Sequence, residues 1–352
     1  AMPGFQNITT FRTNNTGEDL SASSTDFFAD RRGTGLNQYI SIGLPGVPSL
    51  NSKRTYFNRS FLASTNNLWK LGRGEFKANI DYSFNRVTAN ASNITTYFLN
   101  NGNRVITENR AGTEHQHSMS GKFIYELNQK TAFINNTLQT NTDWNDINLS
   151  TFGSIPNTQS ADLPDYYVSN RFKMIQRFKG KHLVTFESRN EWESLPQTLS
   201  LDVNGNAYRQ HIGDHAFHTQ ESAAYAFSLK GITISLEGGI KGYWRSMNSE
   251  LPDMPEQLPG VTENVVHTNS FTVYATPKLE YWIKRVNLSL NLPISYAHYS
   301  FDKAIANHDE AYFSPSLSFN WKPNNRFSGA VRGGIGRSPM NLNLIHPGLI
   351  MT

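Results

Sequence analysis

The residues best suited to chemistry in this sequence are three closely spaced histidines. His211, His215 and His218 surround Asp214, and imidazole and carboxylate groups are common metal ligands. A spacing of four residues would place His211 and His215 on one side of a helix, but Gly213 and the alternating flanks favour a strand. In a strand, His218 points away from the other two. We therefore expect a loop that leads into a strand, and no metal site.

A stretch that starts at Asp202 is similar to the beginning of a calcium-binding loop. An EF-hand loop needs Gly at its sixth position and Glu at its twelfth, but this sequence has Ala207 and Gly213 there. A tight turn at Asn204-Gly205 is the simpler interpretation, because this pair favours short turns. We expect a turn and no bound cation.

No set of residues forms a recognisable catalytic group. Glu191 and Glu193 share a strand face and could be the acid pair of a glycosidase, but they lie beside Arg189 on a face expected to be solvated. Gly334-Ile335-Gly336 lacks the following helix that a phosphate loop requires. The sequence has no cysteine, which removes thiolate metal sites and cysteine nucleophiles. We expect no enzymatic activity, no catalytic residues and no cofactor.

The elements that carry these residues are predicted by alternation along the chain. Every second residue is apolar or glycine from Val286 to Tyr296, from Ile232 to Trp244 and from Phe76 to Phe84. Charged residues occur only in the polar sets of these stretches. A period of two is typical of a strand with one apolar and one polar face.

Short polar turns join such strands into hairpins, and longer segments separate the hairpins. The turns are centred near residues 72, 129, 180, 230, 284 and 324. Loops are predicted at roughly 87–116, 143–165, 194–215, 245–267 and 299–310. Residues 56–352 thus form six hairpins, and residues 1–55 lead into them with one or two weak strands, at Phe5 to Arg12 and Asn37 to Gly43. Short turns at one end and long loops at the other are typical of outer-membrane β-barrels.

Strand length and tryptophan placement favour such a barrel over a soluble β-sandwich. The predicted strands have about 12 residues, which exceeds the usual sandwich strand and climbs about 28 Å at a tilt near 45°. The six tryptophans fall at the two strand ends: Trp69, Trp282 and Trp321 near short turns, and Trp144, Trp192 and Trp244 at the far ends. We predict an all-β, antiparallel, transmembrane outer-membrane β-barrel, with its apolar face toward lipid and its polar face lining the lumen.

Composition excludes several other classes of protein. Aromatic residues make up 12% of the 352 residues, which argues against disorder. The low content of Glu, Lys and Leu argues against a coiled coil, and no apolar run is long enough for a membrane helix. The net charge of +4 is spread along the chain, so nucleic-acid binding has no support.

Four short motifs are informative beyond their alternation. They are Leu195-Pro196-Gln197-Thr198-Leu199-Ser200 followed by Gly205 and Arg209-Gln210, Phe313-Ser314-Pro315-Ser316-Leu317-Ser318-Phe319, Ile335-Gly336-Arg337-Ser338-Pro339, and Phe5-Gln6-Asn7-Ile8 with Thr13-Asn14-Asn15. These motifs resemble the barrel region of Bacteroidetes-type TonB-dependent outer-membrane receptors. The resemblance covers most of the chain and implies a receptor that captures a large, scarce nutrient outside the bacterium. In that family the nutrient passes a plug domain that is driven by the TonB complex.

The sequence departs from the family pattern at both ends. No plug pattern precedes the strands, and no closing strand follows Pro347-Gly348. We expect a partial barrel of about 12–14 of roughly 22 strands in the bacterial outer membrane. Its expected partners are outer-membrane lipid, the missing plug and remaining strands, and the TonB complex through that plug. A surface lipoprotein is a further candidate partner.

Aromatic residues in and near the predicted loops are the candidate substrate contacts. In receptors of this kind such residues often hold the cargo, which implies this role for Trp144, Tyr166, Tyr167, Tyr208 and Tyr243. Two other functional classes stay open. One is a complete small barrel that acts as a pore or adhesin, and the other is a soluble β-rich carbohydrate-binding protein.

Overall fold

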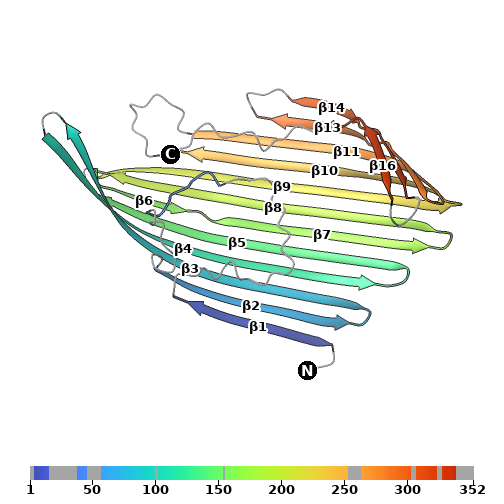
Figure 1. Cartoon of the computed structure of the whole chain (residues 1–352), viewed down its shortest axis with the longest axis horizontal. Coiled ribbons are helices and arrows are strands. Elements are labelled where there is room, and N and C mark those ends of the chain that lie inside the picture. The colour runs from blue at the N-terminus through green and yellow to red at the C-terminus, as the bar shows by residue number, and fades with distance from the viewer. Residues whose placement is uncertain are drawn as a thin grey trace.

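The structure is a computed structural model that describes residues 4–15, 38–45, 57–99, 102–153, 155–252, 263–302, 307–322 and 327–337. Within these ranges all regular structure is β-strand, and no helix there could span a membrane. The strands lie side by side in one broad, curved sheet (Figure 1). The predicted all-β, antiparallel class is therefore confirmed.

The described ranges contain 16 strands, and nine of them, with 14 to 27 residues each, are longer than strands of globular proteins usually are. They are β1 (Phe5–Asn14), β2 (Phe57–Leu71), β3 (Gly74–Leu99), β4 (Gly102–Asn128), β5 (Ala132–Phe152), β6 (Asn157–Asp162), β7 (Asp165–Phe178), β8 (His182–Val203), β9 (Asn206–Leu229), β10 (Ile232–Glu250), β11 (Glu263–Ile283), β12 (Val286–Asn291), β13 (Ile294–Phe301), β14 (His308–Phe313), β15 (Ser316–Trp321) and β16 (Gly329–Gly334).

Three of the long strands are interrupted by proline and then continue. β6 resumes as β7 after Pro164, β12 as β13 after Pro293, and β14 as β15 after Pro315, each in an unchanged register against its neighbours. Proline has no N–H to donate to the ladder, which explains the breaks. Counting each interrupted strand once reduces the 16 strands to 13, within the expected 12 to 14.

The strands follow one another in an antiparallel meander. After the interruptions are joined, each strand pairs with the strands before and after it in the sequence. Among the described residues β1 pairs only with β2 and β16 only with β15, so these two strands form the edges of the sheet.

The short turns lie where the sequence predicts them. Lys230-Gly231 joins β9 to β10 with φ of 47° and 85°, and Asn204-Gly205 joins β8 to β9 with φ of 54° and 84°. Positive φ at both residues is the turn geometry that matches strand twist. The Gly205 N–H also donates to the Asp202 carboxylate at 2.9 Å. The tight turn predicted at this site is thus confirmed.

The predicted long loops are largely wrong, because strands continue through them. β3 runs to Leu99 and β4 begins at Gly102, inside the loop predicted at 87–116. The loop predicted at 194–215 is the end of β8, a two-residue turn and the start of β9. Beyond Trp192, the strand face that carried apolar residues holds Ser194 and Thr198 instead. The alternation from which we predicted strands therefore stops, although the pairing continues.

The first residues of the chain contain one of the two predicted weak strands. The candidate at Phe5 to Arg12 is β1. The candidate at Asn37 to Gly43 is wrong, because residues 38–45 form no strand; Asn37 itself lies outside the described residues. Residues 38–45 instead lie across the sheet (Figure 1). Ile40 and Ile42 pack there with Ala161 of β6 and with Leu163, which follows β6.

The two faces of the sheet differ in chemistry. We call the face with Trp144, Trp192 and Trp244 the apolar face and the opposite face the polar face. Leu236 is 54% exposed and Trp244 is 40% exposed on the apolar face. The polar face carries buried charged residues such as Glu191 and Arg245. This inverts the arrangement of a soluble sheet, in which apolar rows are covered.

The apolar face also carries a carboxylate, on β9. Glu221 of β9 lies four residues from Phe217 on the same face and accepts hydrogen bonds from neutral neighbours. Ser188 Oγ donates to it at 2.7 Å and Asn190 Nδ2 at 3.2 Å, while Thr219 donates to Asn190 at 2.7 Å. The alternation in the clearest strands did not predict a carboxylate on this face.

Candidate functional site

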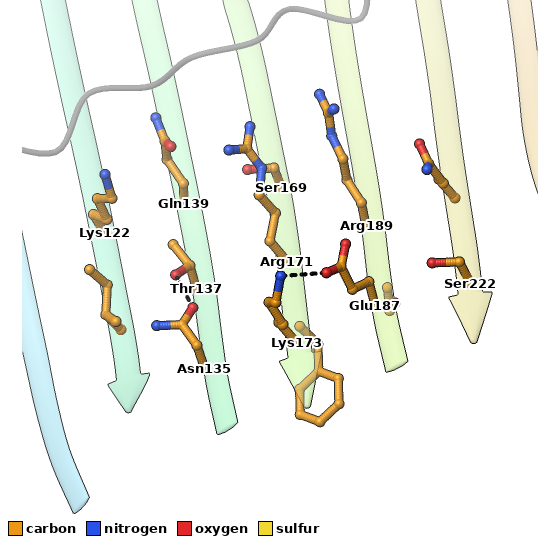
Figure 2. A pocket seen from close by; sticks show the side chains of 14 residues that line it. Lys122, Asn135, Thr137, Gln139, Ser169, Arg171, Lys173, Glu187, Arg189 and Ser222 are labelled. Carbon is orange, nitrogen blue, oxygen red and sulfur yellow. Dashed lines mark hydrogen bonds and ion pairs between the residues drawn. The ribbon is translucent and has the colours of Figure 1, made fainter. Parts of the chain in front are cut away.

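The polar face holds a cavity lined by charged side chains, which come from the neighbouring strands β4, β5, β7, β8 and β9. Its volume is about 600 Å³. Figure 2 shows the side chains that reach into it from these strands. Its lining has four basic side chains, one acidic side chain and several neutral polar ones. The basic residues are Lys122, Arg171, Lys173 and Arg189, the acid is Glu187, and Asn135, Thr137, Gln139, Ser169 and Ser222 are among the neutral residues.

Strand register explains why these side chains meet. Arg171 lies directly opposite Arg189 on the next strand, and Thr137 lies opposite Arg171 on the other side. Every second residue of a strand faces the same way, so one register brings a whole set to one face. Lys173 lies opposite Glu187, and their Nζ–Oε1 distance is 2.5 Å (Figure 2).

Glu191 holds the two arginines in place from the same face of β8, two residues beyond Arg189. Arg189 donates to both of its carboxylate oxygens, at 2.9 and 2.7 Å, and Arg171 Nη2 lies 3.4 Å from Oε1. The Tyr167 hydroxyl donates to the same carboxylate at 3.1 Å. Glu191 is only 2% exposed. A buried carboxylate is tolerated when it is paired and hydrogen-bonded in this way.

A second buried charge pair fixes residues 38–45 on the polar face. Arg245 donates to Asp214 through Nε at 3.0 Å and Nη2 at 2.8 Å, and the Tyr39 hydroxyl donates to Asp214 at 3.0 Å. Gln197 Oε1 accepts from the backbone N–H groups of Tyr39 at 2.9 Å and Ile40 at 2.8 Å. Burial and the negative charge of Asp214 raise the pKa of Tyr39, so its hydroxyl remains a donor.

Apolar packing supports this attachment. Ile40 and Ile42 join a buried cluster with Ile147, Ile212 and Met247, which come from β5, β9 and β10. These strand residues lie beyond the level of Trp144 and Trp244, on the side away from the short turns. Residues 38–45 therefore cover the polar face in its distal part, by which we mean the part beyond those tryptophans.

The structure places the five predicted substrate contacts on different faces of the sheet. Trp144 and Tyr166 lie on the apolar face, whereas Tyr167 and Tyr243 lie on the polar face. Tyr167 is 1% exposed, and Tyr243 packs against the buried Tyr299 and Tyr312. Tyr208 is half-buried near the end of the β8–β9 hairpin.

All five residues lie in strands and not in loops, which corrects the basis on which we selected them. Trp144 and Tyr166 point away from the cavity of Figure 2, and Tyr167 contacts its supporting Glu191. Substrate contact by any of them stays a prediction.

All three histidines lie within β9, so the loop that we expected at this place is wrong. His211 and His215 share the apolar face, where Thr198 Oγ1 lies 3.1 Å from His211 Nδ1 and Ser194 Oγ lies 2.7 Å from His215 Nδ1. His218 lies half-buried on the polar face, opposite Glu191. Within the described ranges no three His, Cys, Asp or Glu side chains are arranged to hold a metal ion.

Sequence reasoning missed two parts of this site. It placed Arg189, Glu191 and Glu193 on one strand face, but it did not predict that a single carboxylate would hold arginines from two strands. It also did not predict that residues 38–45 attach to the sheet, since that contact joins Tyr39 to Asp214 and Arg245 far along the chain. The first contact depends on the register of β7 and β8, and the second depends on how residues 38–45 cross the sheet.

Comparison with known proteins gives no assignment. No family model matches the chain, and no curated protein matches it significantly. Inference about function therefore depends on the geometry described above.

Proposed function

We propose that the chain forms part of the barrel wall of a TonB-dependent outer-membrane receptor, a transporter that takes up a large, scarce nutrient. The observation that carries this proposal is the exposure of large apolar side chains on one face of a single, long-stranded sheet. Ile232, Leu236 and Trp244 of β10 are each at least 40% exposed there. Lipid is the environment in which such rows are stable.

The aromatic residues support a fixed position in a bilayer. Tyr281 and Trp321 lie near the short turns on the apolar face, and Trp192 and Trp244 lie on the same face about 12 residues up their strands. Both sets are exposed on the sheet. A tilted strand covers about 25 to 28 Å over that length, which matches the apolar thickness of an outer membrane.

The polar face supports the transport role. A receptor lumen must be polar, and the cavity lined by Arg171 and Arg189 is basic and hydrogen-bonding. These groups favour an anionic or hydroxyl-rich cargo. A plug, the remaining strands, the TonB complex and a surface lipoprotein are the proposed partners, and the bacterial outer membrane is the proposed location.

Tryptophan quenching in vesicles tests the proposal. The full chain is folded into phosphatidylcholine vesicles whose acyl chains carry bromine at either a shallow or a central depth. We expect stronger quenching by the shallow bromine, because the tryptophans lie at two interfacial levels. A chain that remains in the aqueous phase, unquenched by either lipid, would contradict the proposal and favour a soluble β-rich binding protein.

A further inference from the structure

A row of ring-bearing side chains crosses strands β2 to β5 on the apolar face. Phe61 lies opposite Phe84, Phe84 opposite His117, and His117 opposite Trp144. The rings of Phe84 and His117 are 4.7 Å apart. This row belongs to the distal aromatic level that contains Trp144.

A basic row lies two residues farther from the short turns on the same face. Arg59 lies opposite Arg86, Arg86 opposite His115, and His115 opposite Asp146. We call Arg59, Arg86 and His115 the basic row. Both arginines are exposed, and neither forms an ion pair with a residue that the structure describes. Asp146 is engaged by His115, at 2.8 Å between Oδ2 and Nδ1.

Two arginines directly across a strand pair repel each other. Like charges in this position destabilise a sheet, and a surrounding of low polarity strengthens the repulsion. At the equivalent level of β8 and β10, two residues beyond Trp192 and Trp244, the chain has Ser194 and Ser246. The positive charge is therefore local to β2–β4, where a bound anion would remove the repulsion between Arg59 and Arg86.

The position of the row indicates the kind of anion. If the apolar face meets lipid, the distal aromatic level marks the membrane interface, and the phosphate groups of lipids lie just outside it. The long hairpins of outer-membrane barrels are external, so this is the outer leaflet. The planar guanidinium group matches the oxygens of a phosphate and binds them through two hydrogen bonds.

We propose that Arg59, Arg86 and His115 bind the phosphate of an anionic lipid headgroup in the outer leaflet, of the phosphate-monoester type that lipid A carries. The proposal rests on the proposed membrane function. It adds a lipid site on the outer surface of the wall, separate from the cavity on the polar face. The headgroup supplies a negative charge to Arg59 and Arg86, for which the structure gives no ion pair with a described residue.

Binding of lipid A to the full chain in detergent micelles tests this site. Affinities are measured for phosphorylated lipid A and for the same lipid after phosphate removal, using wild type and the double variant R59Q/R86Q. We expect wild type to prefer the phosphorylated lipid by roughly 10- to 30-fold, since each arginine near an anionic headgroup contributes a few-fold to ten-fold. The double variant should lose this preference. An R104Q variant, which alters an exposed arginine at the far end of the same β3–β4 hairpin, should keep it.

Inorganic phosphate and vesicle insertion separate the possible outcomes. Free phosphate at millimolar concentration should not displace the lipid; full displacement would show an anion site without lipid selectivity and overturn the proposal. Equal preference in wild type and R59Q/R86Q would also overturn it. If the chain inserts into brominated vesicles but R59Q/R86Q binds lipid A like wild type, the lipid site fails and the membrane function stands. If the chain does not insert, both fail.

Discussion

Glu191 is the residue on which the charges of the candidate site depend. It is 2% exposed and contacts Arg171, Arg189 and the Tyr167 hydroxyl. Removing its charge leaves two guanidinium groups close together without their shared partner. The cost of losing the buried member of such a network is large because the two arginines, 30% and 26% exposed, then repel each other with only partial access to water.

We therefore expect Glu191→Gln to lower the free energy of unfolding by about 3 kcal/mol. Urea unfolding of the detergent-folded chain, followed by tryptophan fluorescence, measures the change. Glu187→Gln is the matched control, because Glu187 pairs with Lys173 on the same strand and both side chains are nearly half exposed. That control should change stability by less than about 1 kcal/mol. Equal losses in the two variants would show that Glu191 does not hold the arginines together.

Tyr39 gives the attachment of residues 38–45 a dependence on pH. Its pKa is raised above the ordinary value of 10.0, so the folded state binds the phenolic proton more tightly than the unfolded state does. The resulting stability is present below about pH 10 and is lost as pH rises from there toward the folded-state pKa. We expect the stability difference between wild type and Tyr39→Phe to shrink above pH 10.

Unfolding of both proteins at pH 8, 9, 10 and 11 checks this prediction for Tyr39. The comparison removes the contributions of other tyrosines and lysines, because both chains contain them. Parallel profiles for wild type and the phenylalanine variant would mean that the Tyr39–Asp214 contact is absent in solution.

At the scale of elements, two turns of the same geometry differ in their surroundings. Gly205 and Gly231 have φ of 84° and 85°, which L side chains rarely adopt. A Cβ at Gly205 meets nothing within 4 Å, whereas a Cβ at Gly231 would lie 2.8 Å from the Trp282 carbonyl oxygen. The turn at Gly231 is therefore crowded by the neighbouring strand, and the turn at Gly205 is open.

Alanine at these two positions separates backbone strain from crowding. We expect Gly205→Ala to cost about 1 kcal/mol of unfolding free energy, from the left-handed backbone alone. Gly231→Ala should cost about 1–3 kcal/mol more, since the backbone at Trp282 must also shift. Urea unfolding in detergent gives both values. If the Gly231 variant is as stable as the Gly205 variant, the backbone of β11 at Trp282 can shift without a cost in unfolding free energy.

The sequence predicts elements well where one face of a strand is uniformly apolar. Ile232 to Trp244 and Val286 to Tyr296 alternate clearly, and β10, β12 and β13 lie there. Beyond Trp192 the same face becomes polar, so the strand continues without the signal from which we predicted it. Turns such as Asn204-Gly205 were predictable, because only a few residue types adopt the required backbone angles.

The candidate site was less predictable, because its contacts depend on register. Arg171 meets Arg189 only when β7 and β8 are aligned, and a shift of one residue would move each arginine to the opposite face. Tyr39 contacts Asp214 across 175 residues of the chain, and no local pattern encodes that contact. The sequence did not predict Glu221 on the apolar face for another reason. Its hydrogen-bond partners Ser188 and Asn190 lie in the neighbouring strand β8, and they make a carboxylate tolerable there.

At the scale of the whole molecule, the environment of the apolar face decides between a membrane wall and a soluble sheet. Leu236 of β10 is 54% exposed and lies near the middle of the row between Ile232 and Trp244. In water, lysine at such a site costs almost nothing and adds solubility. In lipid, the same charge must reach the interface or remain without water.

We expect Leu236→Lys to lower the unfolding free energy of the vesicle-folded chain by about 2–4 kcal/mol, the range for lysine near the bilayer centre on a strand that faces lipid. Ser235→Lys is the matched control on the adjacent residue, because Ser235 lies on the polar face opposite Ala226. It should cost less than about 1 kcal/mol, since the charge remains in contact with water. Urea titration in phosphatidylcholine vesicles measures both variants. If Leu236→Lys lowers the unfolding free energy no more than Ser235→Lys does, the apolar row does not face lipid. Another protein surface must then cover these apolar side chains.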